Sequence, residues 1–167
     1  MTVRQIVRYP ERSLKVPSEP FSGSPEEAEA LIRDLLDTMQ ESPATVGLAA
    51  PQIGEGIRAF VMDVSGHRRA TSAQGLVALL DPVLFSSEGA ETVREGCLSV
   101  PDLTANVSRA TSIVLEGRTA QGERKRYEME GFEARAALHE LDHLDGLLIL
   151  DRVASAGEIF ARKVYGT

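Results

Sequence analysis

The stretch "ALHELDHLDG", residues 137–146, holds two of the three histidines in the chain. His139 and His143 stand four residues apart, and Glu140 directly follows the first. On an α-helix residues four apart lie within about 40° of each other, so both imidazoles would point the same way. They could then hold one metal ion, with Glu140 close enough to reach a bound water but angled away from direct ligation.

The residues around this motif have the pattern of a buried helix. "GFEARAALHELDHLDG" predicts a helix from about Phe132 to Leu144, ended by Gly146. Apolar side chains surround the motif, namely Phe132, Ala134, Ala136, Ala137, Leu138, Leu141 and Leu144. Ionisable groups on a buried helix need a partner. A metal site is therefore favoured over the alternative, in which two histidines and a glutamate lie on a solvated helix face.

The third ligand must come from another part of the chain, because a catalytic metal site usually has three protein ligands. Cys97, in "REGCLSVP", is the candidate, since a thiolate binds divalent iron, zinc or cobalt strongly and Gly96 permits close backbone approach. The alternative is a small buried hydrophobe, the commonest fate of a free cysteine. Taken together with the histidine pair, Cys97 is better interpreted as a metal ligand than as a buried hydrophobe. We expect His67, in a polar loop, to be exposed to solvent.

Length and composition limit the classes of protein to which the chain can belong. A chain of 167 residues favours one compact domain spanning residues 1–167. The net charge of −7 and the absence of tryptophan argue against nucleic-acid or anionic-membrane binding. One cysteine excludes an internal disulfide. The first residues lack the apolar core of a signal peptide, and no apolar run has transmembrane length. These features predict a cytoplasmic protein.

The remaining elements predict the fold class. Ser24 as N-cap, Pro25 and Glu27 indicate a helix over residues 24–42. Periodicity predicts strands over 57–64 and 76–85, the second of them bent at Pro82. It also predicts a hairpin over 112–130 that turns near Gly122, and a short helix over 156–167. Residues 95–103 are expected to be short and extended at best. The class is α+β, with mainly antiparallel sheets around the metal-binding helix and helices near both ends.

Three segments together resemble a known family. "GLAAPQ" (47–52), "EGCLS" (95–99) and "HELDH" (139–143) occur in the order and rough spacing seen in peptide deformylases. The resemblance covers nearly the whole chain. It implies removal of the formyl group from the N-terminal formyl-methionine of new bacterial polypeptides. The implied partners are N-formyl-methionyl nascent peptides, with transient ribosome contact.

The resemblance also assigns roles to residues. It implies that the metal ligands are Cys97, His139 and His143, and that the general acid/base is Glu140. It implies an oxyanion hole formed by Gln52 and the backbone N–H of Leu98. It also implies that an extended substrate pairs with the backbone of Val46, Gly47 and Gly96. The implied cofactor is one divalent ion, Fe(II) in the cell, with zinc or nickel able to occupy the site.

The chemistry of these residue types suits hydrolysis of a formamide. A divalent ion lowers the pKa of its bound water toward about 7. Glu140 would take that proton and later deliver it to the leaving amine, which is too basic to depart as an anion. An amide donor such as Gln52 can stabilise the developing oxyanion by roughly 3 kcal/mol. The alternative for Gln52 is an exposed loop residue; its apolar neighbours favour a pocket.

Three departures from the family pattern keep alternatives open. Thr45 stands where glycine is usual, Leu138 replaces a usual glutamine, and Thr104 a usual arginine. A β-branched residue does not easily adopt positive φ, so the loop at Thr45 is expected to be reshaped. One alternative is a deformylase-like protein with altered substrate preference or reduced activity. Another, based on H-E-x-x-H alone, is a zincin-type metallopeptidase, although no third histidine or glutamate stands at the usual downstream spacing.

Two aspartates beside the ligands have no assigned place. Asp142 and Asp145 could orient an imidazole or meet an arginine such as Arg109, or both could face solvent near the helix end.

Overall fold

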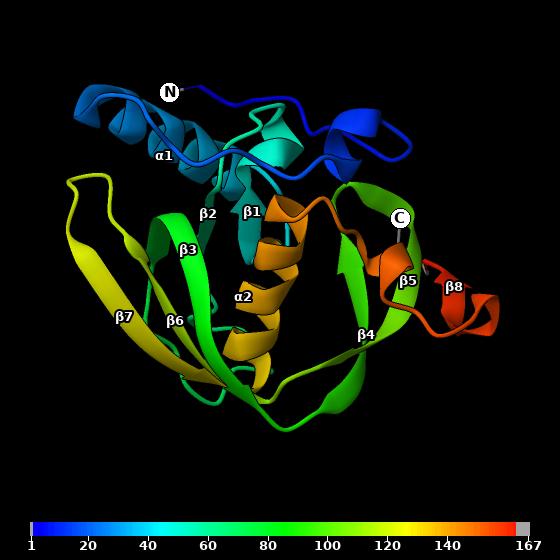
Figure 1. Cartoon of the computed structure of the whole chain (residues 1–167). Helices are drawn as coiled ribbons and strands as arrows, with labels where there is room; N and C mark the ends of the chain where they lie inside the picture. The colour runs from blue at the N-terminus through cyan, green and yellow to red at the C-terminus, as the bar shows by residue number, and fades with distance from the viewer. Residues whose placement is uncertain (1, 163–167) are drawn as a thin grey trace.

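Two antiparallel sheets flank a central helix in this computed structural model, which describes residues 2–162 (Figure 1). The central helix is α2 (Gly131–Leu144), and a second helix, α1 (Pro25–Gln40), lies across one end of the five-stranded sheet. The sheets have strand orders β1-β2-β3-β6-β7 and β4-β5-β8. The expected α+β class with antiparallel sheets is confirmed. No helix in residues 2–162 is long and apolar enough to cross a membrane.

Helix α1 begins where the sequence predicts. The Ser24 hydroxyl accepts a hydrogen bond from the Glu27 N–H at 3.2 Å, and the Glu27 carboxylate accepts one from the Ser24 N–H at 2.8 Å. This reciprocal cap satisfies two backbone donors that the first turn leaves free. The buried stripe of the helix includes Leu31 and Leu35 and packs over β1 and β2. Both strands therefore have a fixed support behind them.

The five-stranded sheet follows the sequence pattern closely. Its strands are β1 (Gly47–Ala49), β2 (Ala59–Met62), β3 (Val77–Glu88), β6 (Ser112–Arg118) and β7 (Arg124–Glu130). The register of β3 against β6 shifts between Leu80 and Val83, which confirms the expected irregularity at Pro82. The β6–β7 hairpin turns at Gly122, whose φ of 87° suits glycine.

The three-stranded sheet contains a hairpin that the sequence pattern did not predict. The expectation that residues 95–103 are short and extended at best is wrong, because they join two long strands, β4 (Glu91–Cys97) and β5 (Val100–Arg109). Glu95 of β4 and Arg109 of β5 both point inward and are buried. Because charged residues occupy core positions, the alternation of apolar and polar residues that marks a strand is lost.

The C-terminal expectation is also wrong where the structure describes it. Ala156–Glu158 form a single 3-10 turn, and Ile159–Ala161 form β8, which pairs with β5. Residues 163–167 lie outside the described residues. The edge of β5 offers backbone partners, and the Phe160 ring lies under the Arg94 guanidinium. These tertiary contacts override the local helical propensity.

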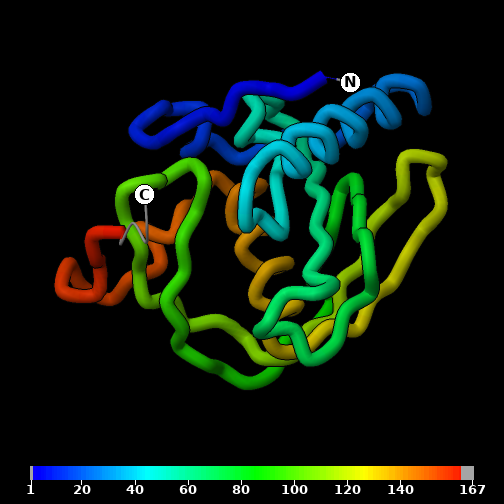
Figure 2. Tube along the Cα trace, turned by 180° about the vertical axis from the view of Figure 1, so that it is seen from behind, coloured from blue at the N-terminus to red at the C-terminus, as the bar shows by residue number. Residues whose placement is uncertain are grey.

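The core fixes α2 between the sheets. One cluster, including Phe60, Leu79 and Leu141, lies between α2 and the five-stranded sheet. A second cluster lies under α1. A third joins Cys97 to Leu14 and to the 3-10 helix Ile149–Asp151. The N-terminal segment, with a 3-10 helix at Arg12–Lys15, crosses the same end of the molecule as α1 in both views (Figures 1 and 2).

Candidate metal centre

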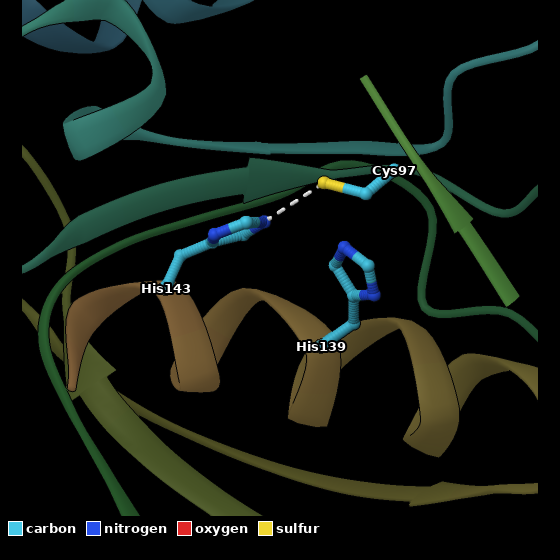
Figure 3. A group of neighbouring side chains, drawn as sticks. All are labelled: Cys97, His139 and His143. Atoms are coloured by element: carbon cyan, nitrogen blue, oxygen red, sulfur yellow. Dashed lines mark hydrogen bonds between the residues drawn. The ribbon is translucent and has the colours of Figure 1, made fainter. Parts of the chain in front are cut away.

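Three ligand-type side chains meet between the two sheets. Cys97 comes from the end of β4, and His139 and His143 project from one side of α2 (Figure 3). The Cys97 Sγ lies 3.4 Å from the His143 Nε2, and the ligand atoms of all three residues lie within 4.8 Å of one another. Bonds to zinc or iron of about 2.0–2.3 Å fit donors at such separations. One sulfur and two imidazole nitrogens form a donor set suited to a divalent transition metal.

The local charges prepare the sulfur for ligation. Burial alone would raise the pKa of Cys97, but the positive potential of His143 and the hydrogen bonds to both histidines lower it well below its ordinary value. Burial would lower the pKa of His139, and hydrogen bonds to Cys97 and Glu95 raise it instead. The thiolate, the form that binds metal, is thus favoured, and metal binding would displace a proton from His139.

A buried carboxylate holds His139 in place. The Glu95 Oε1 lies 2.9 Å from the His139 Nδ1, and the other ring nitrogen points toward Cys97 (Figure 3). Glu95 also accepts hydrogen bonds from Arg109 at 2.6 and 2.9 Å and from Arg135 at 2.5 Å. Burial would raise the pKa of Glu95, but the hydrogen bonds to His139 and Arg109 lower it far below its ordinary range. A fixed anion behind an imidazole orients the ring and increases its basicity as a ligand.

The same network decides the places of the two aspartates. Asp142 is buried and accepts hydrogen bonds from Arg109 at 2.8 Å and Arg152 at 2.7 Å. Asp145 is exposed and pairs with Arg58 at 3.0 Å. Asp142 is therefore the aspartate that meets Arg109. The chain Glu95–Arg109–Asp142 links β4 to the helix that carries both histidines.

Glu140 is buried beside the ligands. Its Oε2 has no hydrogen-bond partner within residues 2–162, and burial raises the pKa of Glu140. The carboxylate lies directly against Gly47 of β1, where an added Cβ would be 2.6 Å from the Glu140 Oε1. A carboxylate held without hydrogen-bond donors accepts a proton more readily than an ordinary one.

Gln52 turns its amide nitrogen toward the sulfur. The side chain is 2% exposed, and its Oε1 accepts a hydrogen bond from the Ala49 N–H at 3.0 Å. The Nε2 is thereby directed to the Ser99 Oγ at 3.2 Å and the Cys97 Sγ at 3.7 Å. Gln52 lies in the 3-10 helix Ala50–Ile53, directly after β1. The structure thus places Gln52 in a buried pocket rather than in an exposed loop.

Several of these groups line one cavity of about 240 Å³. Besides Glu140, Gln52 and the ligands Cys97 and His139, its walls include Val46, Gly47, Gly96 and Leu98, four residues proposed from sequence to meet substrate. His143 lies behind them, 1% exposed. Gly47 belongs to β1 and Gly96 to β4, the edge strands of the two sheets. The cavity therefore lies between two strand edges.

Sequence reasoning missed part of the cavity lining. His67 is not solvent-exposed as expected but half-buried, and its ring stacks on Phe132 at a centroid distance of 4.2 Å. The loop that carries it folds back over the start of α2, a long-range contact without a local signal. Arg69, Arg94 and Arg162 also line the cavity. Clusters of exposed arginines from distant segments leave no sequence motif.

The structure shows where the three residues that depart from the family pattern lie. The positive φ in the loop before β1 falls on Ala44, at 60°, and not on Thr45. Leu138 is half-buried and packs on the cluster between α2 and the five-stranded sheet. Thr104 pairs with Gly96 on one side and Phe160 on the other. None of the three displaces a ligand.

A cysteine–histidine–histidine set with an adjacent buried carboxylate, between two antiparallel sheets, defines the class of metal-dependent hydrolases. Comparison with known proteins gives the family. The model of the polypeptide deformylase family matches residues 3–158, and the chain belongs to that family. Deformylases are metalloenzymes that act on N-formyl-methionine peptides.

Relatives match along almost their whole length. The chain is 37% identical over 158 residues to the peptide deformylase of Halothermothrix orenii, and the match covers 95% of this chain and 98% of that one. The peptide deformylase of Acidobacterium capsulatum is 38% identical over 157 residues, with coverage of 93% and 89%. The crystal structure of the Thermotoga maritima peptide deformylase matches with a TM-score of 0.83 at 33% identity, over 93% of this chain and 100% of that one.

Proposed function

We propose that this chain is a metal-dependent hydrolase that removes the formyl group from the N-terminal formyl-methionine of newly made polypeptides. The observation that carries the proposal is the meeting of Cys97 with His139 and His143 beside the buried carboxylate of Glu140. A purely structural metal site needs neither a buried acid/base nor an open cavity. Membership of the polypeptide deformylase family supports the same reaction.

Cys97, His139 and His143 would hold one divalent ion. The mixed thiolate and imidazole donors accept Fe(II), zinc or nickel, and by likeness to the family we assign Fe(II) as the ion in the cell. When bound, the ion supplies Lewis acidity, which activates water near neutral pH and polarises the formyl carbonyl. The donor set fits this cofactor because its sulfur is already favoured as a thiolate.

Glu140 would move the proton. It accepts a proton from the attacking water and then transfers it to the amine nitrogen as the C–N bond breaks, so that formic acid and a neutral N-terminal amine result. The formic acid then loses its remaining acidic proton to solvent and leaves as formate. Its raised pKa brings the group closer to neutral pH, where a single residue serves best as base and then as acid. Gly47 allows this carboxylate to lie against β1, close to the site of reaction.

Gln52 and the backbone N–H of Leu98 would stabilise the oxyanion. The Ala49 N–H fixes the Gln52 amide in the orientation that directs its nitrogen to the Cys97 sulfur. Because the donor is already oriented, little reorganisation is needed when charge develops on the formyl oxygen. Leu98 directly follows Cys97 and lines the same cavity.

The peptide would bind as an added strand. Val46, Gly47 and Gly96 line the cavity at the unpaired edges of the two sheets, and edge strands recognise extended peptides through main-chain hydrogen bonds. Because the substrate is a newly made chain, the proposal places the enzyme in the cytoplasm, with transient contact to the ribosome as peptides emerge.

The decisive experiment measures which bond is cleaved. Protein purified without oxygen should release formate from formyl-Met-Ala-Ser, and its internal peptide bonds should stay intact. Cleavage of an internal bond without formate release would support a zincin-type peptidase instead. In Glu140→Ala the metal content should remain while turnover falls at least about 100-fold. Undiminished turnover in that variant would refute the role of Glu140.

A further inference from the structure

The mouth of the cavity is positively charged, although the chain as a whole carries a net charge of −7. Arg69, Arg94 and Arg162 line the cavity and are exposed. Within residues 2–162 none of these three forms an ion pair with a carboxylate, whereas the surface arginines Arg4, Arg58 and Arg126 do. Of the carboxylates in the cavity wall, Glu95 is already paired with two buried arginines.

Two of these arginines are held on one face of the three-stranded sheet. The Arg162 Nη2 lies 2.7 Å from the point where a Cβ on Gly96 would be, so its guanidinium covers that glycine. The Arg162 N–H donates to the Asp102 carbonyl at 2.9 Å, which fixes the backbone beyond β8 to β5. The Arg94 guanidinium lies 3.7 Å from the centre of the Phe160 ring. Contacts with the three-stranded sheet thus hold both side chains in place.

Strand register brings the pair together. Arg94 and Gly96 are two residues apart on β4 and share a face. Thr104 pairs with Gly96 and with Phe160, so both guanidinium groups lie on the same face of the three-stranded sheet, and both line the cavity. Two adjacent cations repel each other and cost folding free energy unless an anion approaches. A conformation that holds them at the edge of a peptide cleft therefore indicates an anionic group on the ligand.

We propose that this arginine pair selects formyl-methionyl peptides that carry an acidic side chain at the second or third residue. The inference rests on the deformylase function proposed above. A peptide added along the β4 edge advances about 3.3 Å per residue and alternates its side chains between faces. One of the two residues after methionine then presents its side chain to the face that bears Arg94 and Arg162. A carboxylate there is attracted, and a lysine is repelled.

The test compares five substrates, of which one has no charged side chain and the other four have one charged side chain each, at the second or third residue. These are the C-terminal amides of formyl-Met-Ala-Ser, formyl-Met-Glu-Ser, formyl-Met-Lys-Ser, formyl-Met-Ala-Glu and formyl-Met-Ala-Lys, and formate release gives kcat/KM for each. At low salt the glutamate peptide should exceed the lysine peptide about tenfold at one position, since each exposed pair contributes modestly. The ratio should fall severalfold at about 0.5 M salt, because these charges are open to screening.

Matched variants assign the effect to the pair. Arg162→Gln and Arg94→Gln should each lower the glutamate-to-lysine ratio of kcat/KM about threefold. Because both peptides are measured with the same variant, a general loss of activity does not change this ratio. Arg126→Gln serves as control, because Arg126 also stacks on an aromatic ring, Phe85 at 4.4 Å, but lies outside the cavity. It should leave the ratio unchanged.

Each outcome bears on one claim. Formate release at equal kcat/KM from all five peptides, or a preference for lysine, overturns the selectivity and leaves the deformylase function standing. An unchanged ratio in both Arg162→Gln and Arg94→Gln also overturns it. Formate release from none of the peptides overturns the proposed function, and with it the inference that rests on that function.

Discussion

The Cys97 Sγ lies 3.4 Å from the His143 Nε2, although the two residues are 46 positions apart in the chain. The contact joins the end of an edge strand to the last turn of the central helix. Because both side chains are buried, the packing of the two sheets on α2 holds the sulfur and the imidazole in contact. The donor set is therefore a property of the fold.

Loss of the sulfur should empty the site. We expect Cys97→Ser to lower metal affinity by more than about 100-fold, beyond the 10–100-fold typical of groups that only orient a ligand. Elemental analysis after dialysis against a weak chelator measures this. His67→Ala is the matched control, because His67 lines the same cavity but lies outside the ligand cluster. Equal metal content in the two variants would contradict the assignment of Cys97.

The Glu95 network should matter for both stability and metal. Glu95→Gln leaves Arg109 and Arg135 buried with less negative charge, and we expect a loss of about 3–5 kcal/mol in the free energy of unfolding. Metal affinity should fall about 10–100-fold, because His139 loses its anionic partner. Urea unfolding and competition with a metal indicator measure the two effects. Glu116→Gln breaks the exposed pair with Arg126 and should cost less than about 1 kcal/mol.

A single methyl group should test how Glu140 is held. In Gly47→Ala the new Cβ would lie 2.6 Å from the Glu140 Oε1 and 3.1 Å from its Cγ, so the carboxylate must move. We expect kcat to fall at least about tenfold with metal content unchanged, because acid/base catalysis depends on position. Gly56→Ala is the control, since nothing lies within 4 Å of its added Cβ. Wild-type kcat in Gly47→Ala would show that the carboxylate can shift without loss.

Removal of the Gln52 amide should slow the reaction without emptying the site. Gln52→Leu keeps a similar volume but loses the donor that points to the sulfur. Loss of one oxyanion donor typically lowers kcat about 100- to 1000-fold. Steady-state formate release at saturating peptide, alongside metal analysis, separates this effect from loss of the ion. A change in KM alone would assign Gln52 to substrate binding.

The sequence predicts those parts of the molecule that have local signals. The Ser24–Glu27 cap and the apolar stripe of α1 lie within a few residues of each other, and so do the two histidines of α2. Cys97 could be proposed as the third ligand because the histidine pair requires a further ligand and a thiolate binds divalent metals strongly. The convergence itself could not be measured from sequence, because it depends on how β4 packs against α2.

The errors have a common physical cause. Glu95 and Arg109 point into the core, where mutual pairing replaces hydrophobicity, so the β4–β5 hairpin lacks the expected alternation. Phe160 forms its contacts with Arg94, far away in the chain, so the C-terminal segment becomes a strand. Arg162 reaches the cavity only because β8 pairs with β5. Such long-range contacts are invisible to periodicity and capping rules.

A last prediction concerns the ion pair between Lys15, in the N-terminal 3-10 helix, and Asp151, in the 3-10 helix after α2. Asp151 pairs with Lys15 and accepts a hydrogen bond from the Leu148 N–H at 2.8 Å. Burial would raise the pKa of Asp151, but the Lys15 and Leu148 bonds outweigh it and the pKa is lowered. The unfolded state then binds the proton more tightly, so the ionised carboxylate stabilises the fold above the unfolded pKa of about 3.9. That contribution is lost as the pH falls through the lower folded pKa.

Asp151→Asn should therefore lower the free energy of unfolding at pH 7 by about 1 kcal/mol or less, because the pair is partly exposed and screened. The difference from wild type should shrink as the pH falls through the unfolded pKa of about 3.9 and then through the lower pKa of the folded carboxylate. Urea unfolding at a series of pH values measures it. Lys15→Met should show the same pH dependence, and the double variant should add nothing further, since both changes remove one interaction. A difference that grows toward acid would mean that Asp151 is stabilised in its protonated form, and the pairing with Lys15 would not explain its role.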